Sequence, residues 1–121
     1  MKKAQNNLNP ALMESEVSLI SRGSSFEGTL RLQSITRFHG ILKGKLIGEP
    51  NSLIIISETG LIEGEIEADS IWIEGFVRGD VRAKTKITLS SSGRVLGNLQ
   101  GPSLEIQPGA YFEGQCKMEN L

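Results

Sequence analysis

A pair of glycines recurs along this chain, usually four residues apart and in the pattern Gly-x-apolar-x-Gly-x-apolar. Two outer copies, at Gly23 and Gly109, carry one extra residue between the glycines. The second glycines of the copies are Gly28, Gly44, Gly64, Gly79, Gly97 and Gly114. The steps between them are 16, 20, 15, 18 and 17 residues. A period near 17 with variable corners is typical of a protein that stacks one structural unit on the next.

Apolar or small residues stand two before, two after and four after each second glycine, and mostly polar residues stand between them. This period of two predicts a strand with one buried face in every repeat. The pattern predicts buried side chains at Ile62, Ile66, Val77, Val81, Val95 and Leu99, and exposed ones at Glu63, Glu65, Arg78 and Arg82. The glycine itself falls in the inward set, which suits a place where backbone crowds the core or bends.

A second apolar strand lies upstream of the glycine pair in several repeats, as in Ile71 with Ile73 and Ile87 with Leu89. In the segment 52–56 the pattern leaves the inward pair open between Leu53/Ile55 and Ile54/Ile56. Corners of two to five residues are too short to join parallel neighbours, but a whole repeat is long enough. We therefore predict an all-β solenoid in which each repeat is one coil. The alternative is an antiparallel meander, although its Asn-Gly and Asp-Gly turn signals are missing.

Composition excludes several functions. The net charge is −1, no basic face carries interleaved aromatic residues, and no phosphate-cradling glycine motif is present, so neither nucleic acid nor nucleotide is expected as a ligand. The lone cysteine, Cys116, occupies an inward column and is predicted to be a small buried hydrophobe. There is no signal peptide or long apolar stretch, so a cytoplasmic protein is expected.

Residues 1–16 lie outside the repeat and are predicted to be a flexible tail ahead of a domain spanning 17–121. A second interpretation is a weak amphipathic contact with the inner face of the membrane. The residues that would make this contact are Lys2, Lys3, Leu8, Leu12 and Met13.

No constellation of catalytic or metal-ligating residues stands out, so no catalytic site, metal or cofactor is expected. The one histidine, His39, falls at a corner, and a lone histidine makes neither a zinc site nor a triad. The acidic residues Glu63 and Glu67 alternate outward and face Arg78 and Arg82 one coil on, which predicts ladders of opposite charge rather than a cation site. An enzyme with a β-helix fold remains as an alternative that would require a polar cleft.

Several segments resemble the bactofilins, polymer-forming bacterial cytoskeletal proteins. The resemblance spans about residues 23–119 and is carried by the segments 26–30, 60–68, 73–83, 93–99 and 108–118. It implies a right-handed parallel β-helix of about six triangular coils and nucleotide-independent assembly through both ends of the rod. It also implies roles in cell shape and in localising peptidoglycan-modifying enzymes. Members of this family often carry an N-terminal membrane-targeting peptide.

The lack of end caps predicts self-assembly independently of the resemblance. A solenoid needs polar caps, or its end coils leave backbone and core uncovered. No capping segment is recognised after Met118, so we expect the last coil to bind another rod through Tyr111, Phe112 and Met118. Phe112 also occupies an inward column and could simply plug its own coil. The rival class is a β-helix binding scaffold that does not polymerise.

Overall fold

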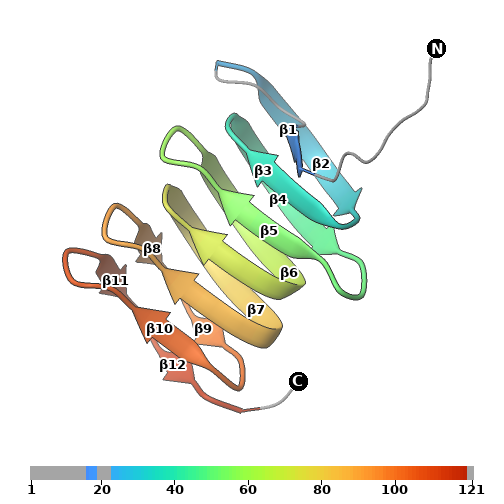
Figure 1. Cartoon of the computed structure of the whole chain (residues 1–121). Helices are drawn as coiled ribbons and strands as arrows, with labels where there is room; N and C mark the ends of the chain where they lie inside the picture. The colour runs from blue at the N-terminus through green and yellow to red at the C-terminus, as the bar shows by residue number, and fades with distance from the viewer. Residues whose placement is uncertain (1–15, 19–22, 120–121) are drawn as a thin grey trace.

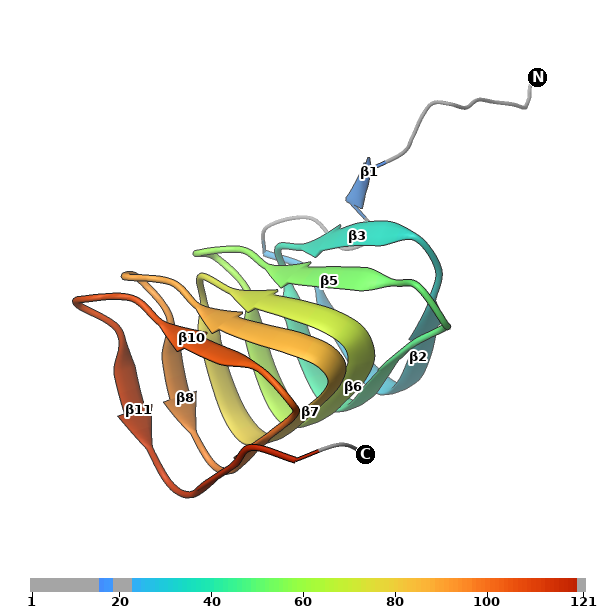
Figure 2. The same cartoon turned by 60° about the horizontal axis from the view of Figure 1, so that its bottom comes forward.

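The computed structural model describes residues 16–18 and 23–119, which coil into one rod of strands without helices (Figure 1). Figure 2 shows the coils one behind another, with the two ends of the described chain at opposite ends of the rod. The strands are β1 (Glu16–Ser18), β2 (Ser25–Leu32), β3 (Ile35–Phe38), β4 (Ile41–Gly48), β5 (Leu53–Ile56), β6 (Leu61–Ile73), β7 (Phe76–Leu89), β8 (Arg94–Leu96), β9 (Leu99–Gln100), β10 (Leu104–Ile106), β11 (Tyr111–Glu113) and β12 (Cys116–Lys117).

Every strand pairs in parallel with its counterpart one coil on, as predicted for a solenoid. Gly28 pairs with Gly44, Gly44 with Gly64, and Gly64 with Gly79. Strands β8 and β9 continue this column, and β11 and β12 end it. The chain therefore makes five full turns between Gly28 and Gly114, with six rungs in the glycine column. The antiparallel meander is wrong, because all described pairings are parallel.

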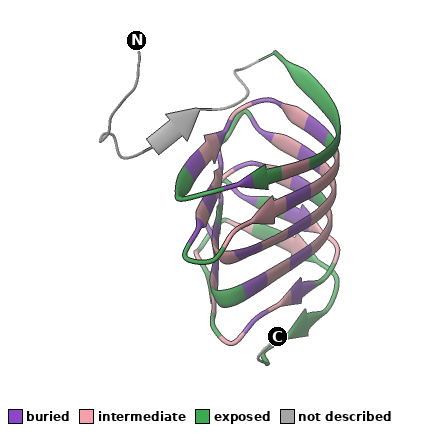
Figure 3. Ribbon diagram, turned by 90° about the vertical axis from the view of Figure 1, so that its right-hand side faces the viewer, coloured by how far each residue is buried: buried purple, intermediate pink, exposed green. Residues whose placement is uncertain are grey.

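The core is a thin aliphatic column, and the predicted inward residues fill it. Ile62, Ile66, Val77, Val81 and Val95 are fully buried and Leu99 is 1% exposed. In β5 the buried pair is Ile54 and Ile56, which settles the register that the sequence left open. Figure 3 shows buried residues alternating with half-buried ones along the middle strands, whereas exposed residues gather in the first and last coils.

The glycine column is required by both conformation and space. Gly64 and Gly79 have φ of +146° and +145°, backbone angles that residues other than glycine rarely adopt. A Cβ added to Gly64 would overlap the carbonyl oxygen of Gly44, and one added to Gly79 would overlap that of Gly64. Successive coils can therefore approach at strand spacing only if glycine stands at each rung.

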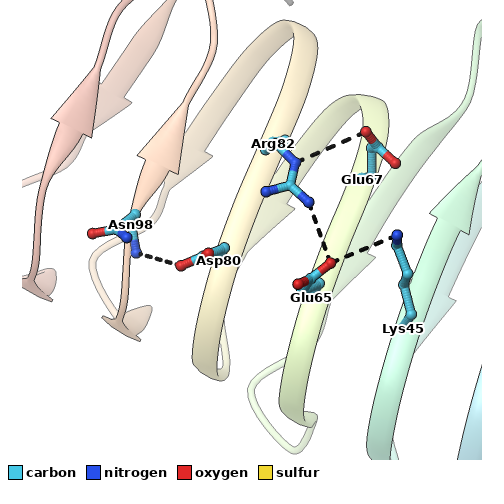
Figure 4. Close-up of polar contacts among 6 residues, drawn as sticks. All are labelled: Lys45, Glu65, Glu67, Asp80, Arg82 and Asn98. Carbon is cyan, nitrogen blue, oxygen red and sulfur yellow. Dashed lines mark hydrogen bonds and ion pairs between the residues drawn. The ribbon is translucent and has the colours of Figure 1, made fainter.

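The predicted charge ladders lie on the outer face beside this column (Figure 4). The Arg78 guanidinium lies 3.5 Å from Glu63, and the Glu65 carboxylate lies 3.6 Å from Lys45 and 3.2 Å from Arg82. These side chains are partly exposed, so each pair contributes at most about 1 kcal/mol. Farther along, the Asp80 carboxylate accepts a hydrogen bond from the backbone N–H of Asn98 at 3.2 Å. These contacts mark the register of the coils more than they stabilise the rod.

The glycine column generates a matched pair of substitutions, Gly64→Ala and Gly28→Ala. Both residues have positive φ, so each alanine costs about 1–3 kcal/mol in backbone strain. Only Gly64→Ala adds an overlap with the preceding coil, since the nearest atom to a Cβ at Gly28 is 3.9 Å away. In thermal melts followed by circular dichroism, Gly64→Ala should unfold at a clearly lower temperature than Gly28→Ala. Equal melting temperatures would show that inter-coil crowding is not a constraint.

Candidate functional site at the ends of the rod

The C-terminal end of the rod exposes the outer edges of three strands. Strands β10, β11 and β12 pair with β7, β8 and β9 of the preceding coil. No other strand in the described part of the chain lies against them. Half of the backbone hydrogen-bonding groups along these edges therefore face outward. Such an edge is a template for pairing with another chain.

Apolar side chains accompany these open edges, among them the three residues predicted from the sequence. Tyr111 is 47% exposed and Met118 is 63% exposed, while Phe112 is half-buried and packs against the core. Phe112 is the register partner of Val95, so it ends the inward column and plugs its own coil. Tyr111 is the register partner of Arg94 and faces outward. The sequence thus placed all three residues in the end coil, and their role in assembly stays a prediction.

The prediction that Cys116 is buried is wrong. Its register partner Leu99 is buried, but Cys116 itself is exposed. Earlier residues of this column point into the core, but among the described residues no further coil lies beyond Cys116 to cover it. Partial desolvation raises the pKa of the Cys116 thiol above its ordinary value, so the thiol is mostly protonated at neutral pH.

Two surface pairs orient polar side chains of the last coil, one within that coil and one with the preceding coil. The Tyr111 hydroxyl donates a hydrogen bond to the Glu113 carboxylate at 3.0 Å, and this bond, with the charge of Glu113, raises the pKa of Tyr111. The Lys86 ammonium lies 2.9 Å from the Glu105 carboxylate, and this hydrogen bond and charge lower the pKa of Glu105. Both pairs tie outward side chains to their own rod.

The N-terminal end is open over only part of its surface. Strand β1 pairs with β3 in the register Glu16 to Ile35, whereas β2 has a described partner on one side only, β4. Phe26 and Ile35 are 39% and 40% exposed at this end. Sequence reasoning missed β1 and assigned Glu16 to the tail, because this strand has no glycine pair on which to align it. The three residues Glu16, Val17 and Ser18 are also too few to show the apolar–polar alternation that predicts a strand.

The residues proposed for a membrane contact, Lys2, Lys3, Leu8, Leu12 and Met13, lie outside the described residues. No helix in the described ranges is long and apolar enough to cross a membrane. His39 is half-buried at the corner between β3 and β4. Within residues 16–18 and 23–119, no three metal-ligating side chains gather into a site.

The fold places the chain among the parallel β-solenoid proteins, and comparison with known proteins gives its family. The family model described as "Bactofilin: Polymer-forming cytoskeletal" matches residues 18–117. The chain belongs to the bactofilin family.

Individual relatives agree with this assignment. Bactofilin BacO of Myxococcus xanthus (strain DK1622) is 31% identical over 80 residues, which cover 66% of this chain and 62% of the relative. Bactofilin BacP of the same organism is 25% identical over 82 residues, which cover 66% of this chain and 34% of the relative. The chain thus matches less than two thirds of the length of these curated relatives.

A solved structure also matches the fold. It is the cryo-EM reconstruction of Thermus thermophilus bactofilin double helical filaments, with a TM-score of 0.71 and 26% identity. The match covers 83% of this chain and 97% of the solved one. The fold class predicted from the sequence is therefore confirmed.

The exposed thiol of Cys116 provides a probe of the C-terminal end. If this end binds another rod, assembled protein should react with a maleimide much more slowly than unassembled protein. Because the thiol pKa is raised and the thiolate is the reactive form, the rate for unassembled protein should keep rising as the pH passes the ordinary cysteine pKa. Equal labelling rates in assembled and unassembled protein would show that Cys116 stays uncovered.

Proposed function

We propose that this chain is a structural protein that assembles end to end into cytoskeletal filaments. The observation that carries the proposal is the coincidence of unpaired strand edges and exposed apolar side chains at both ends of the rod. Among the described residues, nothing covers the outer edge of β2 beside Phe26 at one end or that of β11 beside Tyr111 at the other. Pairing of two ends would satisfy backbone groups and bury apolar surface in one contact.

The energetics of such a contact do not call for a nucleotide. The groups that would meet are backbone N–H and C=O groups together with apolar side chains such as Phe112 and Met118. Their association is driven by desolvation and strand pairing, and mass action alone sets the extent of assembly. The proposed filament therefore forms without nucleotide binding or hydrolysis.

The double helical filaments of the Thermus thermophilus relative suggest the form that the assembly takes. We extend this form to the present chain and propose a filament of two protofilaments. In such a filament every subunit presents the same side face, so a weakly binding partner is arrayed at high effective concentration. This arrangement supports the proposed roles in bacterial cell shape and in positioning peptidoglycan-modifying enzymes.

The proposed location is the cytoplasm, with the inner face of the cytoplasmic membrane as the surface along which filaments lie. Lys2, Lys3, Leu8, Leu12 and Met13 are the proposed membrane contact. Pelleting with anionic vesicles, compared between the full chain and a chain starting at Glu16, the first residue of β1, tests this part separately. Equal pelleting of the two chains would contradict a membrane role for these residues.

Two substitutions test the C-terminal end, Phe112→Arg and Met118→Arg. Each places a charge where apolar ends would meet, so both should abolish filaments in negative-stain electron micrographs recorded without nucleotide. Met118 is 63% exposed, so Met118→Arg should keep its β circular dichroism, whereas Phe112→Arg also removes a plug from the core.

The control is Lys84→Glu, which changes an exposed charge on the side of an interior coil and should leave filaments intact. Filaments in both arginine variants would rule out this end as a contact. A wild-type chain that runs as one small, defined oligomer and forms no filaments would favour the non-polymerising scaffold instead.

A further inference from the structure

Trp72 is the exposed apolar side chain that the proposed end contacts do not explain. The large apolar side chains most exposed within residues 23–119 are Phe26, Ile35, Trp72, Ile106, Tyr111 and Met118. Phe26 and Ile35 belong to the first coil, and the last three belong to the final coil. Trp72 is 36% exposed and lies on β6, in an interior coil. Stacking of rods through their ends would leave it in water.

Trp72 lies in an apolar patch on one side of the rod. The register places it beside Ile55 of the preceding coil, and Leu53 lies two residues before Ile55 on the same outward face. Leu53 and Ile55 are half-buried, and Ile35, the register partner of Leu53, is 40% exposed. We call Ile35, Leu53, Ile55 and Trp72 the lateral patch. Beside the glycine column, by contrast, the outward side chains are the ion-paired Lys45, Glu65 and Arg82 described above.

The indole of Trp72 is held in place by Glu74, just after the end of its strand. Its Nε1–H donates a hydrogen bond to the Glu74 carboxylate at 2.9 Å. The polar group of the ring is therefore satisfied, and its apolar surface remains available to a partner. An ordered tryptophan loses little side-chain entropy on binding, which is why such residues dominate the energetics of many interfaces.

We propose that the lateral patch binds the lateral patch of a second copy of this chain and so joins two protofilaments side by side. This inference rests on the proposed function. A filament of two strands requires a contact that the rod ends cannot supply, and a relative of this fold is solved as double helical filaments. An apolar patch in the middle of the side face meets that requirement.

The register shows which residues a symmetric contact would bring together. A two-fold axis through Trp72 would place the two indoles against each other and Ile55 of each copy opposite Thr88 of the other. Two coils away, Arg37 would stand opposite Glu105, which is already paired with Lys86. The apolar contact centred on Trp72 therefore carries the proposal, and the charges of this face do not.

The same surroundings disfavour a lipid surface as the occupant. The Glu74 carboxylate lies against the indole, and the Glu105 carboxylate lies farther along the same face. The Glu74 carboxylate, which is bonded to the indole itself, would be repelled by anionic headgroups, and Lys86 on this face is already paired with Glu105. The second copy is therefore the occupant that the observations favour.

The proposal is tested with Trp72→Lys and Trp72→Phe, each examined by electron microscopy and circular dichroism. Trp72→Lys should keep its β signal and form single-stranded filaments, because the ends remain intact while the side contact acquires facing positive charges. Trp72→Phe keeps an aromatic surface and should form two-stranded filaments, as the wild type does. Thr85→Lys, an added charge at an exposed position on β7 in the next interior coil, is the matched control and should also stay two-stranded.

Fluorescence gives an independent reading, because Trp72 is the only tryptophan of the chain. In filaments its emission should shift to shorter wavelength and resist acrylamide quenching, whereas in unassembled Met118→Arg it should not. Two-stranded filaments of Trp72→Lys, or equal quenching in filaments and in unassembled protein, would overturn the lateral contact while leaving the end-to-end filament standing. A blue shift that appears only with phosphatidylglycerol vesicles would show that the lateral patch binds lipid and not a second copy. If the wild-type chain forms no filament at all, the proposed function and the lateral contact both fall.

Discussion

The close approach of successive coils along the glycine column is the constraint on which the rest of the structure depends. At Gly44, Gly64 and Gly79 a Cβ would overlap the carbonyl oxygen of the glycine one coil earlier. The column therefore fixes the register of every coil, and the register in turn aligns Ile62, Val77 and Val95 into one core. It also aligns the outward charges into ladders. A slip of one residue would bring polar side chains into the core and remove glycine from the point of contact.

The same geometry explains why end-to-end assembly is the function that we propose. Interior coils satisfy their backbone by pairing with a neighbour on each side, whereas an end coil has a neighbour on one side only. The end coils therefore expose apolar side chains: Phe26 at one end, and Tyr111 and Met118 at the other. Cys116 is also exposed, although earlier residues of its column are buried. The ends and Trp72, at the centre of the proposed lateral contact, are separate surfaces, so the two proposed contacts can be varied independently.

Much of this could be predicted from the sequence because the period of two and the repeated glycine are local signals that recur in every coil. The inward columns, the parallel stacking and the charge ladders followed directly. The first strand, β1, was missed because it has no glycine pair, and Cys116 was misplaced because a column position predicts direction and not whether a further coil covers it. The exposure of Trp72 could not be predicted either. Its outward position in β6 was implied by Ile71 and Ile73, but a tryptophan in a strand pattern does not reveal whether a partner is present.

The measurement that tests the central claim most directly is diffraction from oriented filaments of the wild-type chain. If rods join end to end, the strands lie across the filament, and the strand spacing of about 4.8 Å should appear along the filament axis. Six rungs at that spacing predict a subunit repeat of about 29 Å within each protofilament. A reflection near 4.8 Å perpendicular to the filament axis would show that the rods lie crosswise and assemble through their sides, which would contradict the account.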